Sequence, residues 1–302
     1  MRLSKVADRA DLIALLGTDA KIEQPSGEIL FKQEFSGYNL ETLSLQLNTL
    51  EEVPAYFAYP TTGEGPYPLV IFNHSHGGNF TLGKSELVKG NSYLQQPTFM
   101  EVLIKMGYAV GCIDMWGFGE RQGKKESELV KEFLLTGRTL WGMRIFDDQQ
   151  FITYLSGRTE IDATRIATIG MSMGGMMSWW LAALDPRVKL TVDIAGQVEL
   201  ETLITMRGLD HHGFYYYVPG LLTHFSTLAI QEMIVPRYRL SLVGKTDNMC
   251  PIAGVDLLDK KLQKSYGQAA MADHWQSAAM TGGHQETGEM RRTWINFLQK
   301  NL

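Results

Sequence analysis

Cysteine is scarce in this sequence, which holds two cysteines, Cys112 and Cys250, among 302 residues. They form no C-x-x-C pair, and two are too few for a disulfide scaffold. We therefore expect two buried free thiols rather than a disulfide-stabilised secreted domain.

A strong charge of one sign is also missing, because 28 basic and 33 acidic residues give a formal net charge of -5. No basic run or basic helix stands out, which argues against nucleic acid or an anionic membrane as a partner. Residues 1–17 mix charged and apolar residues and lack the uninterrupted apolar stretch of a secretion signal or membrane helix. We expect a cytoplasmic protein with a small-molecule partner, and the sequence leaves its oligomeric state open.

What the sequence does have is a series of short apolar runs, most of them separated by stretches long enough for helices. Continuous apolar runs suit strands buried on both faces, so we predict a mostly parallel sheet flanked by helices. Residues 28–59 alternate instead and predict antiparallel strands at the sheet edge, after a short N-terminal helix. With no internal repeat, residues 1–302 are expected to form a single domain. The runs are PLVIFNH, YAVGCIDMWG, RIATIGMS, LTVDIAGQ, YRLSLVGKTD and SAAMTGGH.

The strand rhythm fails over residues 197–237, which are long, partly helical and rich in histidine and tyrosine. We interpret this segment as an insert after the sixth strand and as a candidate lid over the carboxyl edge of the sheet. Tyr215 and His212 are its candidate substrate-binding residues. Aromatic packing within the insert is the alternative for Tyr215, and a capping role is the alternative for His212.

The motif Gly-Met-Ser-Met-Gly at residues 170–174 matches G-x-S-x-G between an apolar run and a helical pattern. In that context glycines flank a serine on a strained strand-to-helix turn, where a Cβ would clash with a neighbouring strand or helix. The turn exposes the Ser172 hydroxyl, and the N-terminus of the following helix favours negative charge beside it. Ser172 is therefore the candidate nucleophile.

A serine nucleophile needs a histidine base, and the base needs a carboxylate that fixes its tautomer. Asp247 and His284 both follow apolar runs, in the chain order expected after Ser172. They are the candidate acid and base. Competing acids remain open, with Glu199 and Glu201 ahead of Asp193 and Asp256.

A tetrahedral oxyanion needs two N–H donors. The first candidate is the backbone N–H of Met173, and the second is that of His76 in the HSHGGN loop, with Gly77 as the rival. A metal site at His74 and His76 is not expected, because no third ligand follows at a matching spacing.

These motifs together resemble the α/β-hydrolase superfamily, and in detail its dienelactone-hydrolase-like and acetyl-xylan-esterase-like members. Further shared features are the loop HSHGGNFTLGK, the D-x-x-G-x-G-E-R stretch at 114–121 and the pattern from Trp141 to Ile166. The resemblance implies an α/β-hydrolase fold over roughly residues 50–300. Two positions depart from it: Ser75 replaces a glycine of the histidine-glycine pair, and Ser172 stands where dienelactone hydrolases carry cysteine.

We therefore predict a serine hydrolase that cleaves small soluble carboxylic esters through an acyl-enzyme, with no cofactor. The same catalytic groups could serve an aminopeptidase-like or thioesterase activity. A non-catalytic ligand-binding protein on the hydrolase scaffold is the alternative from another class, and the complete set of Ser172, Asp247 and His284 argues against it.

Overall fold

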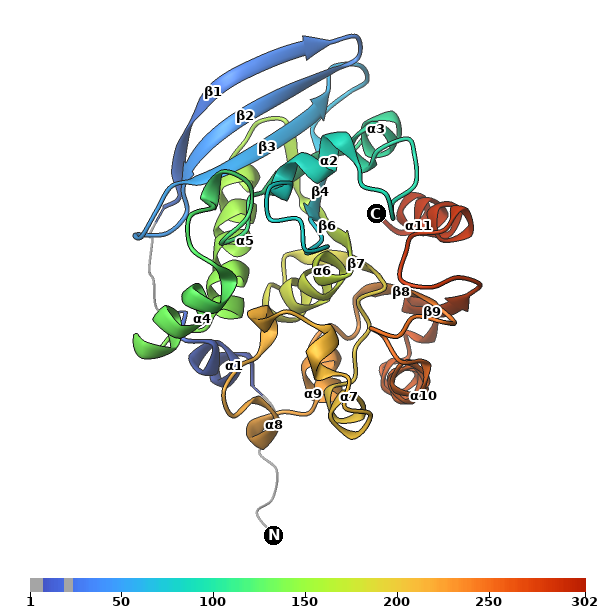
Figure 1. Cartoon of the computed structure of the whole chain (residues 1–302). Helices are drawn as coiled ribbons and strands as arrows, with labels where there is room; N and C mark the ends of the chain where they lie inside the picture. The colour runs from blue at the N-terminus through green and yellow to red at the C-terminus, as the bar shows by residue number, and fades with distance from the viewer. Residues whose placement is uncertain (1–7, 19–23) are drawn as a thin grey trace.

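A computed structural model describes residues 8–18 and 24–302. These residues form a nine-stranded sheet in the order β1-β2-β3-β5-β4-β6-β7-β8-β9 (Figure 1). The strands are β1 Ser26–Phe35, β2 Tyr38–Gln46, β3 Val53–Pro60, β4 Tyr67–Asn73, β5 Ala109–Ile113, β6 Ile161–Met171, β7 Val188–Ile194, β8 Tyr238–Gly244 and β9 Trp275–Met280.

The pairing pattern divides the sheet into two parts. Strands β1, β2 and β3 pair antiparallel, and β3 also pairs antiparallel with β5. The remaining pairs, from β5 through β4 to β9, are all parallel. The predicted mostly parallel sheet with antiparallel strands at its edge is confirmed. All of the parallel strands end at the same edge, where the loops that carry the candidate residues begin.

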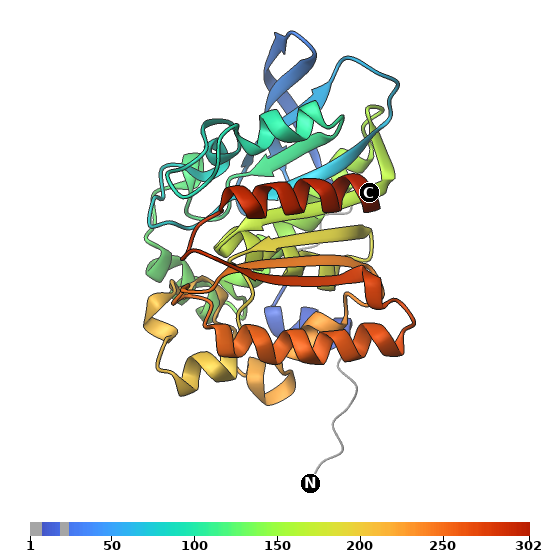
Figure 2. The same ribbon diagram turned by 90° about the vertical axis from the view of Figure 1, so that its right-hand side faces the viewer.

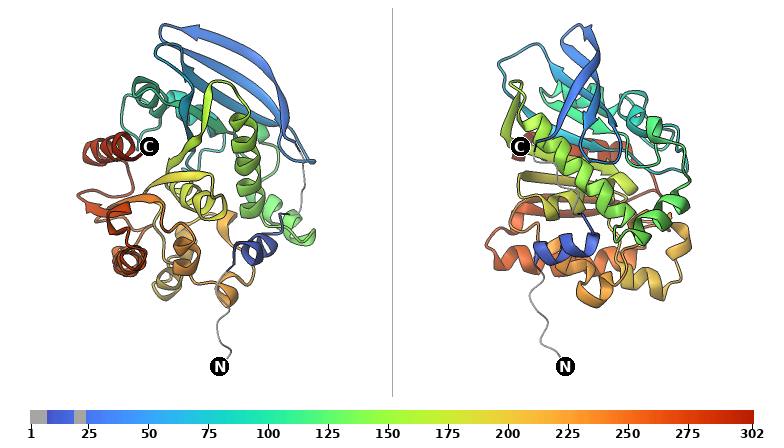
Figure 3. Two further views of the ribbon diagram at one scale, coloured as in Figure 1. Left: turned by 180° about the vertical axis from the view of Figure 1, so that it is seen from behind. Right: turned by 90° about the vertical axis from the view of Figure 1, so that its left-hand side faces the viewer.

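Helices cover both faces of the sheet, which is why its central strands are apolar on both sides. Helices α3 and α11 pack on one face, and α11 crosses in front of the strands in Figure 2. Helices α4, α5 and α6 pack on the other face, where α5 runs diagonally in the right panel of Figure 3. The helices outside the insert are α1 Arg9–Leu16, α2 Glu86–Lys89, α3 Phe99–Lys105, α4 Glu126–Leu135, α5 Leu140–Ser156, α6 Met173–Leu184, α10 Ile252–Gln268 and α11 Gly288–Asn301, with 3-10 turns η1 Gly83–Ser85, η2 Gly119–Arg121 and η5 Ala272–His274.

The segment 197–237 is an insert of short helices between β7 and β8. It therefore follows the seventh strand and not the sixth, because the N-terminal region contributes three strands, with a tight turn at Gly37 between β1 and β2. Its helix α9 packs on α6, so α6 is enclosed on every side and all of its residues are buried. The elements of the insert are α7 Leu200–Thr205, η3 Leu209–His211, η4 Phe214–Tyr216, α8 Leu221–His224 and α9 Thr227–Glu232.

Cys112 and Cys250 are both buried free thiols. In the described part of the chain, every helix is too short or too polar to cross a lipid bilayer. The prediction that residues 1–17 lack a secretion signal or membrane helix concerns in part residues 1–7, which lie outside the described residues.

Candidate active site

Ser172, His284 and Asp247 meet at the carboxyl edge of the parallel strands, although 112 residues separate the serine from the histidine. The Ser172 Oγ lies 2.8 Å from Nε2 of His284. On the other side of the same ring, Nδ1 lies 2.8 Å from Oδ2 of Asp247. In this arrangement the imidazole can take the serine proton while the carboxylate stabilises the charged ring.

The backbone at Ser172 has the positive φ of 58° that a non-glycine residue rarely adopts. The flanking glycines make this turn possible, because a Cβ at Gly170 would lie 2.5 Å from the backbone oxygen of Asn73. A Cβ at Gly174 would collide with the same carbonyl oxygen. Strand β4 therefore packs directly against the turn, which holds the serine at the start of α6.

The carboxylate of Asp247 is held on both of its oxygens. Its Oδ1 accepts the backbone N–H groups of Met249 at 2.9 Å and Cys250 at 3.2 Å, which leaves Oδ2 for His284. The rival acids lie elsewhere: Asp193 is fully buried against Arg239 and Ser241, Glu199 caps α7 through Thr202, Glu201 lies in the first turn of α7, and Asp256 is exposed on α10.

Two backbone regions beside Ser172 carry N–H groups that can receive an oxyanion. Met173 is the first residue of α6, so its N–H has no partner within the helix. In the loop after β4, the N–H of Ser75 donates to Glu86, and that of Gly78 donates to Nδ1 of His76. These bonds leave the N–H groups of His76 and Gly77 as the candidates in this loop.

Ser75, which replaces the glycine of the related motif, is buried and anchors this loop. Both its N–H and its hydroxyl donate to Oε1 of Glu86, each at 2.9 Å. Asp114, which directly follows β5, connects the loop after β5 to the segment after β4. Its carboxylate accepts the backbone N–H of Lys84 at 2.7 Å and the Lys84 ammonium at 2.8 Å. The lysine of HSHGGNFTLGK and the aspartate of D-x-x-G-x-G-E-R thus form one buried link between the two motifs.

His74 and Arg121 contribute to structure at this edge. His74 is fully buried, and burial lowers its pKa to about 4, so the ring is neutral. Its Nδ1 donates to the carbonyl of Ser75, and its Nε2 accepts the N–H of Met115. Arg121 pairs with Glu51 and Asp147.

The insert places Tyr215 and His212, the two candidate substrate-binding residues, in different surroundings. Tyr215 is 3% exposed and packs against the rings of His76 and Trp141, so it belongs to the core. His212 lies nearer to the site, with its Nε2 donating to the carbonyl of Met249. Burial lowers the pKa of the His212 imidazole. For Tyr215, the ring contacts with His76 and Trp141 correspond to the alternative prediction, which was aromatic packing.

Phe214, which the sequence did not single out, is the exposed aromatic residue of this turn, with 59% of its surface accessible. It lines a pocket of about 590 Å³ together with Phe80, Lys125 and Glu126. The ring of Phe80 contacts the His76 ring, with 5.0 Å between centroids, so this pocket borders the candidate oxyanion loop.

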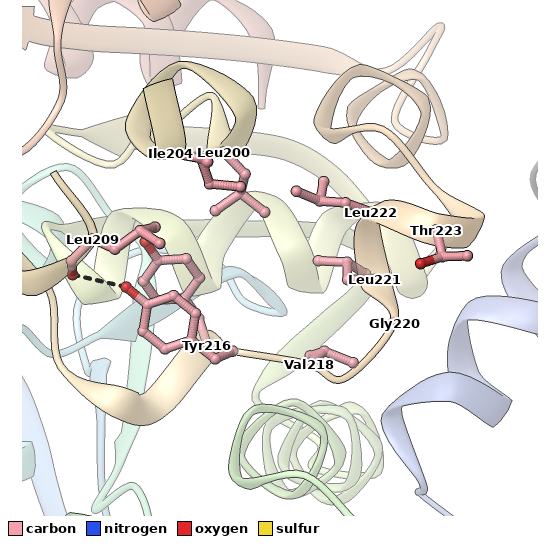
Figure 4. Close-up of a pocket in the computed structure, with 10 residues that line it drawn as sticks. Leu200, Ile204, Leu209, Tyr216, Val218, Gly220, Leu221, Leu222 and Thr223 are labelled. Atoms are coloured by element: carbon pink, nitrogen blue, oxygen red, sulfur yellow. Dashed lines mark hydrogen bonds between the residues drawn. The ribbon is translucent and has the colours of Figure 1, made fainter. Parts of the chain in front are cut away.

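A second pocket, of about 280 Å³, lies within the insert itself (Figure 4). Its lining comes wholly from residues 200–223 and is mostly aliphatic, with Leu200, Ile204 and Leu221 around it. Tyr217 closes one side, where its hydroxyl donates to the carbonyl of Leu209. Ser172, Asp247 and His284 line neither this pocket nor the one at Phe214.

The residues that the structure describes contain one group with the spacing of metal ligands, namely Asp247, Cys250 and His284. Their ligand atoms all lie within 4.8 Å of one another. Both ring nitrogens of His284 are already in hydrogen bonds, so an ion here would displace either Ser172 or Asp247 from the ring.

Residues 68–234 match the family model described as the alpha/beta hydrolase fold. The chain belongs to this family. It is 48% identical, over 97% of its length and 98% of the relative's, to YtaP of Bacillus subtilis (strain 168), which is named as a hydrolase. Among solved structures it resembles a glucuronoyl esterase from Solibacter usitatus, with a TM-score of 0.71, 13% identity and coverage of 96% of this chain and 91% of that one. The acetyl xylan esterase from Paenibacillus sp. R4 gives a TM-score of 0.68 and 15% identity, over 97% and 93% of the two chains.

Proposed function

We propose that this hydrolase is a serine carboxylesterase that cleaves small soluble esters through an acyl-enzyme. The observation that carries the proposal is the pair of 2.8 Å hydrogen bonds that link Ser172 to His284 and His284 to Asp247. An imidazole held between a hydroxyl and a buried carboxylate is the arrangement that activates a serine.

In the first half of the reaction, Ser172 Oγ attacks the ester carbonyl carbon while Nε2 of His284 takes the hydroxyl proton. The N–H groups of Met173 and His76 stabilise the oxyanion that forms. The imidazolium then gives its proton to the leaving alcohol, and the acyl group stays on Ser172. A water molecule releases the acid by the same steps, with His284 again acting as the base.

The proposed substrate is a compact ester whose acyl or alcohol part enters the pocket bordered by Phe80 and Phe214. The two aromatic residues of its lining, Phe80 and Phe214, favour an apolar or ring-shaped group beside them. We further propose that the insert 197–237 acts as the lid over this region, and that the protein works in the cytoplasm without a cofactor.

The test compares the wild-type protein with Ser172→Ala. The variant should fold, and its hydrolysis of a nitrophenyl acetate should fall by at least about 10³-fold, because the nucleophile is gone while the oxyanion donors remain. A fluorophosphonate probe should label the wild-type protein quickly and the variant not at all. A panel of acetylated sugars, thioesters and aminoacyl amides then ranks the substrate classes.

Two results would contradict the proposal. If Ser172→Ala hydrolyses the ester at the wild-type rate, the reaction takes place elsewhere in the protein. If the folded wild-type protein neither reacts with the probe nor cleaves any member of the panel, the chain is a binding protein on a hydrolase scaffold. Thioester or amide cleavage well above ester cleavage would move the proposal to that substrate class.

A further inference from the structure

Glu126, the first residue of α4, is a buried carboxylate that three separate parts of the chain approach. Its Oε1 lies 3.3 Å from Nε2 of His76, in the loop after β4, and 3.3 Å from the guanidinium of Arg144 on α5. Its Oε2 accepts the backbone N–H of Phe214 in the insert at 3.1 Å. None of these partners is a neighbour in sequence, so the fold assembles this cluster by long-range contacts.

In the contact between Glu126 and His76, the imidazole supplies the proton. Because Nδ1 of His76 accepts the N–H of Gly78, the neutral ring carries its proton on Nε2, which faces Glu126. Burial acts to raise the pKa of Glu126, but His76 and Arg144 outweigh it and the pKa is lowered. The carboxylate is therefore charged at neutral pH, and it lies against the His76 side chain on one side.

Arg144 extends the cluster to the helix that follows Ser172. Its guanidinium is fully buried, donates to the carbonyl of Trp116 at 2.6 Å and lies 3.3 Å from the sulfur of Met173. The ring of Phe118 lies 5.2 Å from the guanidinium carbon, and that of Tyr215 lies 5.7 Å from it. Arg144 thus has a fixed position between the Met173 side chain and Glu126.

The side chains of Met173 and His76 therefore contact the same buried ion pair, Arg144 with Glu126, although Met173 begins α6 and His76 lies in the loop after β4. We infer that Glu126, through His76 and Arg144, is a positioning residue that sets the relative placement of the two N–H groups of the oxyanion site and couples it to the insert at Phe214. The inference rests on the proposed function, because it gives the Met173 and His76 N–H groups their role there. Donors placed in advance for the oxyanion matter in the transition state more than in the bound substrate.

The backbone of the insert is fitted closely to this carboxylate. A Cβ at Gly213 would lie 2.7 Å from Oε2 of Glu126 and 3.1 Å from Nε2 of His76. The insert therefore passes directly over the pair, and a displacement of the insert must alter the surroundings of both residues.

The test uses Glu126→Gln, which keeps the shape of the side chain and removes its charge. We expect kcat for a nitrophenyl acetate to fall about 10- to 100-fold with KM changed less than about threefold, since less is lost than when a whole oxyanion donor is removed. The rate of reaction with the fluorophosphonate probe should fall in the same proportion, because its phosphoryl oxygen occupies the same site.

A second variant, His76→Asn, separates the side chain from the backbone donor. The asparagine oxygen can still accept the Gly78 N–H, but it cannot reach Glu126. It should reproduce the loss in kcat, and the double variant should lose little more than either single variant, because the two changes break the same contact.

The matched control is Glu41→Gln, which neutralises another buried carboxylate, on β2, paired with Arg158 at 2.9 Å. It should lower the melting temperature while kcat stays within about twofold of wild type. The inference is overturned if Glu126→Gln behaves like this control, or if the losses of the double variant simply add. Failure of the proposed function is distinguishable, because the wild-type protein itself would then lack esterase activity.

Discussion

The two oxygens of the Asp247 carboxylate have different partners, and this difference determines what an amide would do in its place. Oδ1 is held by the N–H groups of Met249 and Cys250, which only an acceptor can satisfy. An asparagine would therefore place its oxygen there and turn its NH₂ group towards Nδ1 of His284. The ring would then have to carry its proton on Nε2, where it cannot accept a proton from Ser172.

We accordingly expect Asp247→Asn to fold normally and to lose turnover on the order of 10⁴-fold near neutral pH, the loss known for the same change in a serine protease. Steady-state hydrolysis of a nitrophenyl ester measures the effect, and circular dichroism checks the fold. Near-parental turnover in Asp247→Asn, together with inactive Glu199→Gln or Glu201→Gln, would assign the acid to the start of the insert instead.

At the scale of elements, the 3-10 turn η4 puts two adjacent aromatic residues in opposite surroundings. Phe214 is exposed at the pocket beside the candidate oxyanion loop, whereas Tyr215 is buried between His76, Trp141 and Arg144. The same turn therefore places one side chain at the proposed substrate pocket and the next one in the core.

We expect Phe214→Ala to change the ranking of esters by size, with KM for a bulky aromatic ester raised several-fold and the melting temperature nearly unchanged. Tyr215→Ala should destabilise the fold by about 3–5 kcal/mol, as expected for a large aromatic side chain removed from a core. Steady-state kinetics on an ester series and urea unfolding separate the two effects. An altered ranking in a stably folded Tyr215→Ala, with none in Phe214→Ala, would reverse these assignments.

The contrast shows which parts of the site could be predicted from the sequence. Ser172, Asp247 and His284 each follow an apolar strand, so a local pattern is enough to bring them to one edge. Glu126 has no such pattern, because an acidic residue in the first turn of a helix is common, and its partners lie far away in sequence. The orientation of Tyr215 could not be predicted either, since a short 3-10 turn gives no periodicity that distinguishes a buried from an exposed ring.

At the scale of the whole molecule, the parallel sheet and its covering helices could be predicted because both faces of each central strand are apolar. The number of N-terminal strands depended on the short turn at Gly37, which the alternation of residues 28–59 does not reveal by itself. For this reason the prediction that the insert follows the sixth strand was wrong. Its predicted boundaries, 197–237, do fall between the end of β7 and the start of β8.

Stability is a property of the whole fold, and buried His74 makes it depend on pH. The pKa of His74 is about 4 in the folded protein against an ordinary value of 6.5, because burial disfavours the charged ring. Between these values the unfolded chain binds a proton that the folded protein does not. The free energy of unfolding should therefore fall by about 3 kcal/mol as the pH decreases from 6.5 to 4, with no change from this residue at higher pH.

Urea unfolding of wild type and His74→Gln at pH 7.5, 5.5 and 4.5 measures this contribution. The variant should be less stable at pH 7.5 but should lose less stability on acidification than wild type. The exposed His224→Gln serves as the control and should keep the wild-type dependence. Equal slopes for His74→Gln and wild type would assign the acid sensitivity to other groups.

The antiparallel end of the sheet has a practical consequence for handling this protein. Strand β3 runs opposite to β5, and Tyr38 pairs with Pro60 at the end of β3, so the turn at Ser36 and Gly37 lies at the amino edge of the parallel strands. Ser36 is exposed, and both natural thiols are buried. A cysteine introduced at Ser36 would thus be the preferred point for covalent attachment to a bead or electrode, and an immobilised layer made in this way would present Ser172 to the solution.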